Sequence, residues 1–260
     1  MTQSIPILAQ NSRSQKLQAC IHCGLCLEAC PTYLVSGEEM SSPRGRIHLM
    51  KALDEGRIES DDPGFANHQN SCLVCRACET ACPSGVDFGI LMVQTRELIA
   101  ETTKKNPLRK FIYERILGSP NLIRVLQYPL SVISKTHITR LFGKTFDADR
   151  FPLKKLAASL LLLPGGIPLP LKRPRVYYTM RKKRGSVGLL IGCIGDLFTS
   201  NINDATINVL TRLGYDVHTL PEITCCGALP AHAGFGQRAR ELARNAIDEI
   251  INAPIDFYIS

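Results

Sequence analysis

Eight of the eleven cysteines in the chain fall in two runs of identical spacing. The first run, residues 20–31, reads CIHCGLCLEACP, and the second, residues 72–83, reads CLVCRACETACP. Both are C-x2-C-x2-C-x3-C-P, the spacing with which bacterial ferredoxins hold [4Fe–4S] clusters through cysteine thiolates. The sequence therefore predicts two [4Fe–4S] clusters.

The spacing also predicts which thiolates share a cluster. Three closely spaced cysteines of one loop bind one cluster, and in two-cluster proteins the fourth cysteine ligates the other cluster. The first cluster would take Cys20, Cys23, Cys26 and Cys82. The second would take Cys72, Cys75, Cys78 and Cys30. Each loop is thus expected to lend one ligand to its neighbour.

Zinc and disulfides are the alternatives for so many cysteines. Zinc sites commonly pair two C-x2-C knuckles and need neither a third evenly spaced cysteine nor a trailing Cys-Pro. Disulfides would require an oxidising compartment and would consume the thiolates. The spacing favours clusters, and a zinc-stabilised basic binding module is the alternative from another functional class.

Composition sets wider bounds. A length of 260 residues suggests about two domains, and 45% hydrophobic residues is ordinary for a protein with a buried core. Residues 1–18 show no signal-peptide pattern, and the longest apolar stretch, 156–163, is far shorter than the ~20 residues of a spanning helix. With reduced thiolates, these features predict a cytoplasmic protein. Two clusters of about −2 each would lower the formal charge of +8 to about +4, so no nucleic-acid partner is expected.

The residues between the two cysteine loops show no alternating strand pattern. Ser42-Pro43 predicts a helix start, with the helix running to residue 55, and Asp62-Pro63 predicts a second, shorter helix. Further helices are expected at 13–19 and 88–103, and a loop at 32–41. Residues 1–104 are therefore predicted to form an α-helical ferredoxin-type domain.

Residues 105–185 are expected to form a helical, proline-rich basic connecting region. Helices are predicted at 108–117 and 121–127, with prolines such as Pro129 ending them. Seven Lys or Arg residues fall within residues 172–184, beside two tyrosines. A solvated basic linker, a contact with a partner subunit and a contact with an anionic membrane surface are the alternatives for this run.

Residues 186–260 change to an α/β pattern. Strands are expected at 187–192, 215–220 and 255–259, and they alternate with helices at 199–212 and 237–252. This βαβαβ order predicts a parallel sheet with right-handed crossovers, in which sites form at the carboxyl ends of strands. The remaining three cysteines follow the first two strands, and they are candidate ligands of an incomplete third site: Cys193, Cys225 and Cys226. The fold class is thus α+β multidomain, with a partial α/β cysteine-rich module after the helical part.

These segments together carry a family resemblance. The two ferredoxin loops, Cys30-Pro31-Thr32-Tyr33, the segment SPRGRI at residues 42–47 and the later C-x31-C-C-G resemble the iron–sulfur subunit of bacterial glycolate oxidase (glycolate dehydrogenase). The ferredoxin loops are shared with lactate-utilisation proteins and with iron–sulfur subunits of anaerobic glycerol-3-phosphate dehydrogenase and heterodisulfide reductase, a group that includes the CCG-domain proteins. Subunits of those complexes are the alternative functions.

The resemblance implies a non-catalytic electron-transfer subunit of an oxidoreductase acting on the CH–OH group of a 2-hydroxy acid. The complex would oxidise glycolate to glyoxylate, with D-lactate as a second substrate. FAD-containing subunits would take the hydride, and this chain would pass electrons to a quinone or another acceptor, with peripheral association at the inner face of the cytoplasmic membrane as an option. No catalytic residue is expected here, because the chain has no G-x-G-x-x-G fingerprint and no paired acid and base.

The sequence departs from the family pattern at its end. In the family the cysteine-rich module continues to further cysteines and occurs twice, whereas this chain stops at Ser260. The expectation is a truncated module, an exposed sheet edge and a third site that lacks partners. A nonfunctional remnant is accordingly a further alternative.

Some single residues near the loops have two interpretations. His22 could hydrogen-bond near a cluster sulfur or simply face solvent. Arg44, Arg46 and Arg76 could raise a cluster's potential, dock an acidic partner, or be solvated helix charges. The other histidines are expected to be structural: His48, His68, His137, His218 and His232.

Overall fold

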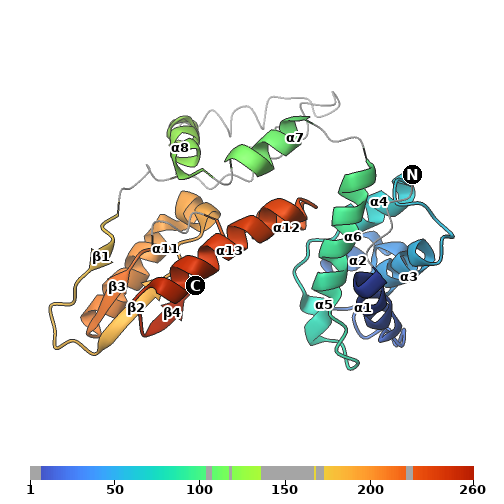
Figure 1. The fold of residues 1–260 in the computed structure, drawn as a ribbon, viewed down its shortest axis with the longest axis horizontal. Helices are drawn as coiled ribbons and strands as arrows, with labels where there is room; N and C mark the ends of the chain where they lie inside the picture. The colour runs from blue at the N-terminus through green and yellow to red at the C-terminus, as the bar shows by residue number, and fades with distance from the viewer. Residues whose placement is uncertain (1–6, 104–106, 117–118, 136–166, 168–172, 221–224) are drawn as a thin grey trace. The chain divides into compact units, whose positions relative to one another are not determined.

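A computed structural model describes residues 7–103, 107–116, 119–135, 167, 173–220 and 225–260. The chain divides into two compact units (Figure 1). Unit 1 comprises Met1–Lys110 and Ala228–Ala239, and unit 2 comprises Phe111–Gly227 and Arg240–Ser260. A late segment of the chain thus belongs to the unit that holds both cysteine loops. The connecting sequence at 136–166, with His137 and the apolar run 156–163, lies outside the described residues.

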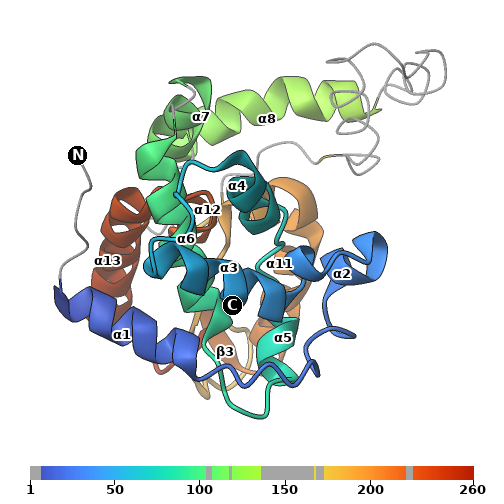
Figure 2. The same ribbon diagram turned by 90° about the vertical axis from the view of Figure 1, so that its right-hand side faces the viewer.

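Unit 1 is helical in its described part. α1, α4 and α5 contact the long helix α6, and α3 packs against α1 and α4 (Figures 1 and 2). The bounds are α1 Ile7–Gln18, α2 Pro31–Ser36, the 3-10 turn η1 Glu39–Ser41, α3 Pro43–Asp54, α4 Pro63–Asn70, α5 Ala77–Thr80, α6 Phe88–Thr102 and α12 Ala228–His232. The helix α7, Pro107–Phe111, follows α6 in the sequence, where unit 1 gives way to unit 2.

Helix starts follow the predicted caps. The Ser42 hydroxyl accepts a hydrogen bond from the Gly45 amide at 3.0 Å, and the Asp62 carboxylate accepts one from the Phe65 amide at 2.7 Å. Each side chain satisfies an amide that the first turn of a helix leaves without a partner. The predicted starts of α3 and α4 are therefore confirmed.

The loop expected at residues 32–41 is wrong, because most of it is helical. α2 begins at Pro31 directly after Cys30, and Gly37 ends it in the left-handed conformation with φ of 68°. Proline in the first turn and glycine after the last are ordinary helix boundaries, so the signal was present in the sequence.

The core of unit 1 lies directly beneath the cysteine loops. Its buried members come from α1, α3, α6 and the second loop: Leu17, Ile47, Met50, Val74, Cys78, Val86, Phe88, Leu91 and Met92. Four further cysteines pack against this cluster while partly exposed: Cys20, Cys26, Cys72 and Cys82. One hydrophobic core therefore supports thiols from both loops.

Unit 2 contains a four-stranded mixed sheet in the order β1-β3-β2-β4. The strands are β1 Val176–Tyr177, β2 Gly185–Leu189, β3 Tyr215–His218 and β4 Phe257–Ile259. β2 pairs in parallel with β3 and β4, which confirms the parallel arrangement of the three expected strands. β1 pairs antiparallel with β3 and was missed, since only two residues within a basic run form it.

The helices of unit 2 differ from expectation at their ends. α8 spans Pro120–Lys135 and continues through Pro129, so the end predicted near residue 127 is wrong. α11 spans Cys193–Arg212, starting six residues before the expected Thr199, where its backbone is kinked. α13 spans Gly236–Asn252, and a π-helical turn, η2, covers Ile112–Ile116. Cys193 therefore lies at the amino end of a helix rather than in a loop.

The sheet order creates a point where connections leave in opposite directions. The chain passes from β2 to β3 on one side and later returns to β4 on the other side of β2. In open α/β sheets, ligand sites form beyond the carboxyl ends of strands at such a switch point. Among the described residues, no helix is long and apolar enough to cross a membrane.

A tight contact between α3 and η1 gives a stability prediction. A Cβ atom on Gly45 would overlap the backbone carbonyl oxygen of Glu39, so Gly45→Ala should force α3 away from η1. Overpacking of this kind costs typically about 1–3 kcal/mol. Urea unfolding of the anaerobic protein, followed by circular dichroism, should show that loss. Gly195→Ala is the matched control, because its Cβ would meet nothing nearer than the Thr199 hydroxyl at 3.9 Å; an equal loss in both variants would contradict the explanation.

Candidate metal centre

The first hollow in unit 1 is lined by the four cysteines assigned to the first cluster. Cys20, Cys23, Cys26 and Cys82 surround it, and Cys78 reaches it from the second loop. Its volume is about 420 Å³, including space open to solvent. That is more than ten times the ~30 Å³ that one water occupies in the liquid, so the hollow has room for a polyatomic group.

The second hollow gathers the other predicted set. Cys30, Cys72, Cys75 and Cys78 line a space of about 300 Å³. Pro43 and Phe88 line both hollows, so the two spaces share a wall of the same core. The structure thus brings together the residues that the spacing assigns to each cluster, while ligation itself stays a prediction.

Matching backbone turns shape the two loops. The second residue after the first cysteine has positive φ in both, His22 at 56° and Val74 at 53°. The fourth residue does too, Gly24 at 87° and Arg76 at 61°. A β-branched valine in this region is strained, and such strain gathers at functional sites where the surroundings impose it. The repeated turns give the two loops the same path around their hollows.

The thiols fit an iron–sulfur group by their chemistry. Thiolates are the ligands of [4Fe–4S] clusters, and each hollow offers four sulfurs against largely apolar walls. In the described part of the chain, no three His, Cys, Asp or Glu side chains converge on a point as ligands of one metal ion do. Sulfurs spread around a hollow suit a group with several metal atoms.

Burial sets the protonation of most of these thiols. Burial, with Cys72 nearby, raises the pKa of Cys78 to about 12, and burial also raises the pKa values of Cys26 and Cys72. These groups are therefore thiols at neutral pH until a cation displaces their protons. Metal binding at such sites releases protons and is coupled to pH.

Cys30 differs from the other ligands. Burial alone would raise its pKa, but a hydrogen bond with Thr32, the amides of Tyr33 and Thr32, and the charge of Arg46 together lower the pKa of this thiol. The Thr32 hydroxyl lies 3.2 Å from Cys30 Sγ, and Cys30 is also the N-cap residue of α2. The amino end of a helix favours an anionic sulfur.

The three arginines near the loops are not equivalent. Arg46 is fully buried, so its interpretation as a solvated helix charge is wrong. Arg44 pairs with Glu39 at 2.7 Å, and Arg76 pairs with Glu79 at 2.7 Å, both partly open to solvent. Spacing in a helix could not separate these cases, because it does not show what lies against each face.

His22 is exposed and faces other polar side chains. Its ring lies 6.2 Å from the His48 ring, and its Nε2 lies 3.4 Å from Lys51 Nζ. Partial burial and then the charge of Lys51 lower the pKa of His22. These contacts agree with the solvent-facing interpretation.

Arg96 in α6 is a functional neighbour that the sequence did not reveal. Its buried guanidinium donates to the backbone carbonyl of Cys72 and to that of Gln69 at 3.1 Å, at the entry of the second loop. It also donates to the His232 carbonyl at 2.7 Å. An arginine within a helix pattern carries no sign of such a partner 136 residues away.

The three remaining cysteines come together in unit 2. Cys193 and Cys225 are hydrogen-bonded, and this contact, followed by burial, raises the pKa of Cys193. Cys226 is near enough to add to that effect by its charge, and it is exposed. They lie beyond the carboxyl ends of β2 and β3, as expected from the topology. Their role as ligands stays a prediction.

Family models match both ends of the chain. A 4Fe-4S dicluster domain matches residues 16–86, and a cysteine-rich domain matches residues 187–260. The first match covers both cysteine loops and confirms the prediction of [4Fe–4S] clusters, with two clusters consistent with its description. The zinc-stabilised module finds no support in these matches.

Curated relatives align along nearly the whole chain. The probable glycolate oxidase iron-sulfur subunit of Bacillus subtilis is 32% identical over 94% of this chain, and the glycolate oxidase iron-sulfur subunit of Escherichia coli is 35% identical over 95%. The chain is a homologue of glycolate oxidase iron–sulfur subunits. It spans 56% of the length of each of these two relatives.

A more distant relative comes from Methanosarcina barkeri. It belongs to that organism's dihydromethanophenazine:CoB–CoM heterodisulfide reductase, and it is 26% identical over 90% of this homologue and covered over 52% of its own length. No solved structure matches the chain. The predicted resemblance to glycolate oxidase iron–sulfur subunits, with heterodisulfide reductase among the relatives, is therefore confirmed.

The lining of the hollows predicts how cysteine variants pair. Cys20→Ser and Cys82→Ser should weaken the same EPR signal of the reduced protein, because both side chains line the first hollow. Cys30→Ser and Cys72→Ser should weaken the other signal. Cys226→Ser, in unit 2, is the control and should leave both signals in place. If Cys20→Ser and Cys82→Ser removed different signals, the assignment of ligands would be wrong.

Proposed function

We propose that the chain is the iron–sulfur electron-transfer subunit of a glycolate oxidase or dehydrogenase complex. The observation that carries this proposal is the pair of thiol-lined hollows on one core, beside the similarity to glycolate oxidase iron-sulfur subunits. When bound, each [4Fe–4S] cluster would accept and release single electrons. The chain would hold one cluster by Cys20, Cys23, Cys26 and Cys82, and the other by Cys72, Cys75, Cys78 and Cys30.

The protein's own part is to fix, insulate and tune these groups. The shared wall of Pro43 and Phe88 keeps the two hollows adjacent and excludes water between them. Adjacent sites allow an electron to pass from one to the other without leaving the chain. Three regions would divide this work: a ferredoxin-type domain at 1–104, a connecting region at 105–185 and a cysteine-rich domain at 186–260.

The partners follow from the same proposal. FAD-containing subunits would oxidise glycolate to glyoxylate, with D-lactate as a second substrate, and would supply electrons to this chain. A quinone or another carrier would accept them on the cytoplasmic side. Cys193, Cys225 and Cys226 would contribute to a third site, completed by groups beyond those described. A lactate-utilisation or heterodisulfide-reductase-like complex is the alternative, favoured by the relative that belongs to a heterodisulfide reductase.

Anaerobic purification tests the cofactors and the complex in turn. The full chain should hold about eight irons with matching sulfide, and stoichiometric zinc without iron would defeat the proposal. Co-expression with the flavoprotein subunits should then give glycolate-dependent dye reduction that Cys72→Ser lowers at least tenfold. Intact clusters without any partner binding would favour a nonfunctional remnant, and D-lactate in place of glycolate distinguishes the substrate.

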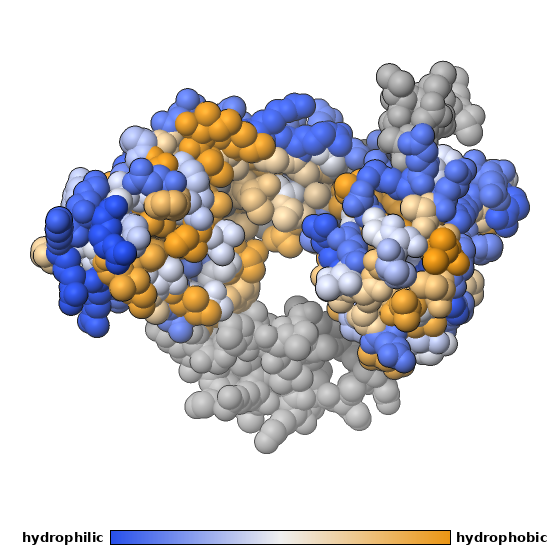
Figure 3. Space-filling model, turned by 90° about the horizontal axis from the view of Figure 1, so that it is seen from below, coloured by the Kyte–Doolittle hydropathy of each residue, from blue (hydrophilic) through white to orange (hydrophobic). Residues whose placement is uncertain are grey.

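A basic loop in unit 2 supports peripheral contact with an anionic membrane. The loop between β1 and β2 exposes Tyr178 at 73% and Met180 at 101%, and the four residues Arg181 to Arg184 that follow are all cationic and exposed. Figure 3 shows the hydrophilic colour gathered at the left-hand end of unit 2, where Figure 1 places this loop. Apolar side chains beside a cationic cluster are the combination that binds acidic lipid surfaces.

Vesicle binding tests this contact. Replacing Arg181 and Lys182 by alanine should weaken binding to phosphatidylserine vesicles by about 2 kcal/mol, roughly thirtyfold, since each cation near the surface contributes about 1 kcal/mol. The matched control replaces Arg212 and Arg244, two exposed arginines on α11 and α13. Cosedimentation is the measurement. Equal binding to phosphatidylcholine vesicles, or an equal loss in the control, would contradict a membrane role for the loop.

A further inference from the structure

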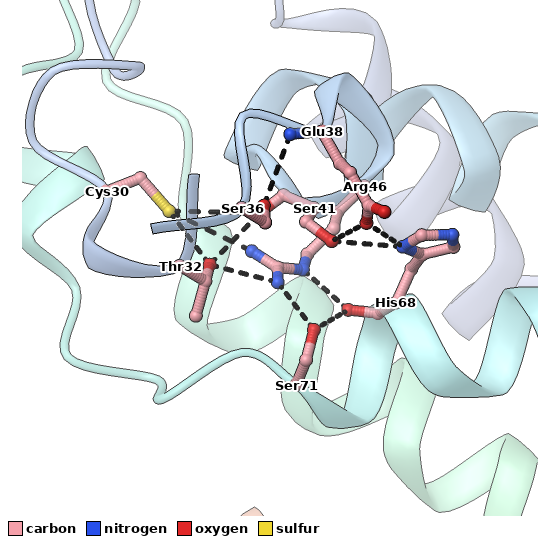
Figure 4. Close-up of polar contacts among 8 residues, drawn as sticks. All are labelled: Cys30, Thr32, Ser36, Glu38, Ser41, Arg46, His68 and Ser71. Carbon is pink, nitrogen blue, oxygen red and sulfur yellow. Dashed lines mark hydrogen bonds and ion pairs between the residues drawn. The ribbon is translucent and has the colours of Figure 1, made fainter. Parts of the chain in front are cut away.

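Arg46 in α3 is a fully buried cation beside the second hollow, with an exposed fraction of 0%. Its Nε donates to the His68 carbonyl at 2.7 Å, and its Nη2 donates to the hydroxyls of Thr32 at 3.1 Å and Ser71 at 2.9 Å (Figure 4). The other terminal nitrogen, Nη1, lies 3.9 Å from Cys30 Sγ. The guanidinium is therefore held in one orientation by three neutral acceptors, with its remaining nitrogen toward a thiol.

No carboxylate neutralises this charge among the described residues that contact Arg46. A buried charge without an opposite charge is strongly unfavourable. The contacting group that can become anionic is the Cys30 thiol, which lines the second hollow together with Cys72, Cys75 and Cys78. A cluster held by four thiolates would carry about −2 and would supply the missing counter-charge.

Thr32 adds a second polar contact to the same sulfur. Its hydroxyl lies 3.2 Å from Cys30 Sγ and 3.0 Å from the Ser41 carbonyl oxygen. A hydroxyl has one proton to donate, and Arg46 already donates to its oxygen. When Cys30 is a thiolate ligand, the Thr32 proton can therefore point to sulfur. Hydrogen bonds to ligand sulfurs and nearby charge are among the factors that set cluster potentials.

The first hollow differs in the arginine that lines it. Arg44, two residues earlier on the same helix, pairs with the Glu39 carboxylate at 2.7 Å and keeps 30% of its side chain exposed. A paired charge that reaches solvent is screened, whereas a buried and unpaired one acts at full strength over a short distance. The two hollows therefore differ electrostatically.

We propose that Arg46, assisted by Thr32, is a positioning and tuning residue that raises the reduction potential of the cluster bound through Cys30 above that of its neighbour. This inference rests on the proposed binding of two clusters. An electron added beside Arg46 increases the negative charge facing the buried guanidinium, so the reduced state is stabilised there. The second site is then where an electron from the flavoprotein comes to rest within this chain, and the first site is the higher-energy step.

The test uses the full chain with its clusters reconstituted anaerobically and EPR-monitored redox titration. Arg46→Met should lower the reduction equilibrium of one cluster about tenfold, which is about 59 mV for a one-electron couple, and leave the other in place. The shifted signal should be the one that Cys30→Ser removes. Thr32→Val should shift the same signal in the same direction by a smaller amount. Arg46→Lys, which keeps the charge, should restore most of the potential, and Arg44→Met is the matched control on the same helix.

The outcomes separate this inference from the proposed function. A wild-type chain without clusters overturns the proposed function, and this inference with it. Two clusters with unchanged potentials in Arg46→Met, or an equal shift of both signals, overturn this inference alone. Loss of the cluster in both the methionine and lysine variants also overturns it, because Arg46 would then be needed for assembly rather than for the potential.

Discussion

The packing of cysteines from two distant loops against one hydrophobic core is the interaction on which unit 1 depends. Met50 from α3 and Leu91 from α6 are fully buried in that core, and Phe88 walls both hollows. Helices with different sequence neighbours thus converge on the same few side chains. The geometry of the thiols is set by this core, because the loops between them contain little regular structure of their own.

The loops are held from outside as well as from below. Arg46 and Arg96 are both buried, and each donates to backbone carbonyls at the start of the second loop or just before it. Backbone carbonyls at such positions cannot all find partners within a helix, so side-chain donors satisfy them. Two arginines therefore serve as structural donors and as positive charges close to the thiols.

Local patterns in the sequence predicted the features that depend on neighbouring residues. Spacing revealed the cysteine loops, caps at Ser42 and Asp62 revealed helix starts, and apolar runs revealed three parallel strands. Features that depend on distant packing were missed: the buried state of Arg46 and Arg96, the two-residue strand β1 and the passage of α8 through Pro129. Charge and proline patterns describe what a residue prefers on average, and tertiary contacts override that preference. The ligand sets, the third site and the three-region division stay predictions.

The segment Ala228–Ala239 belongs to unit 1 although it lies far along the chain, and its His232 carbonyl accepts from Arg96 across 136 positions. Synthesis at about 5–20 residues per second would separate the two partners by roughly 7 to 27 seconds. During that interval the nascent helical unit would already present its cysteines, while one contact to Arg96 is still missing. Delivery of iron and sulfide to the ribosome-bound chain would then meet a looser second loop than the one in the finished protein.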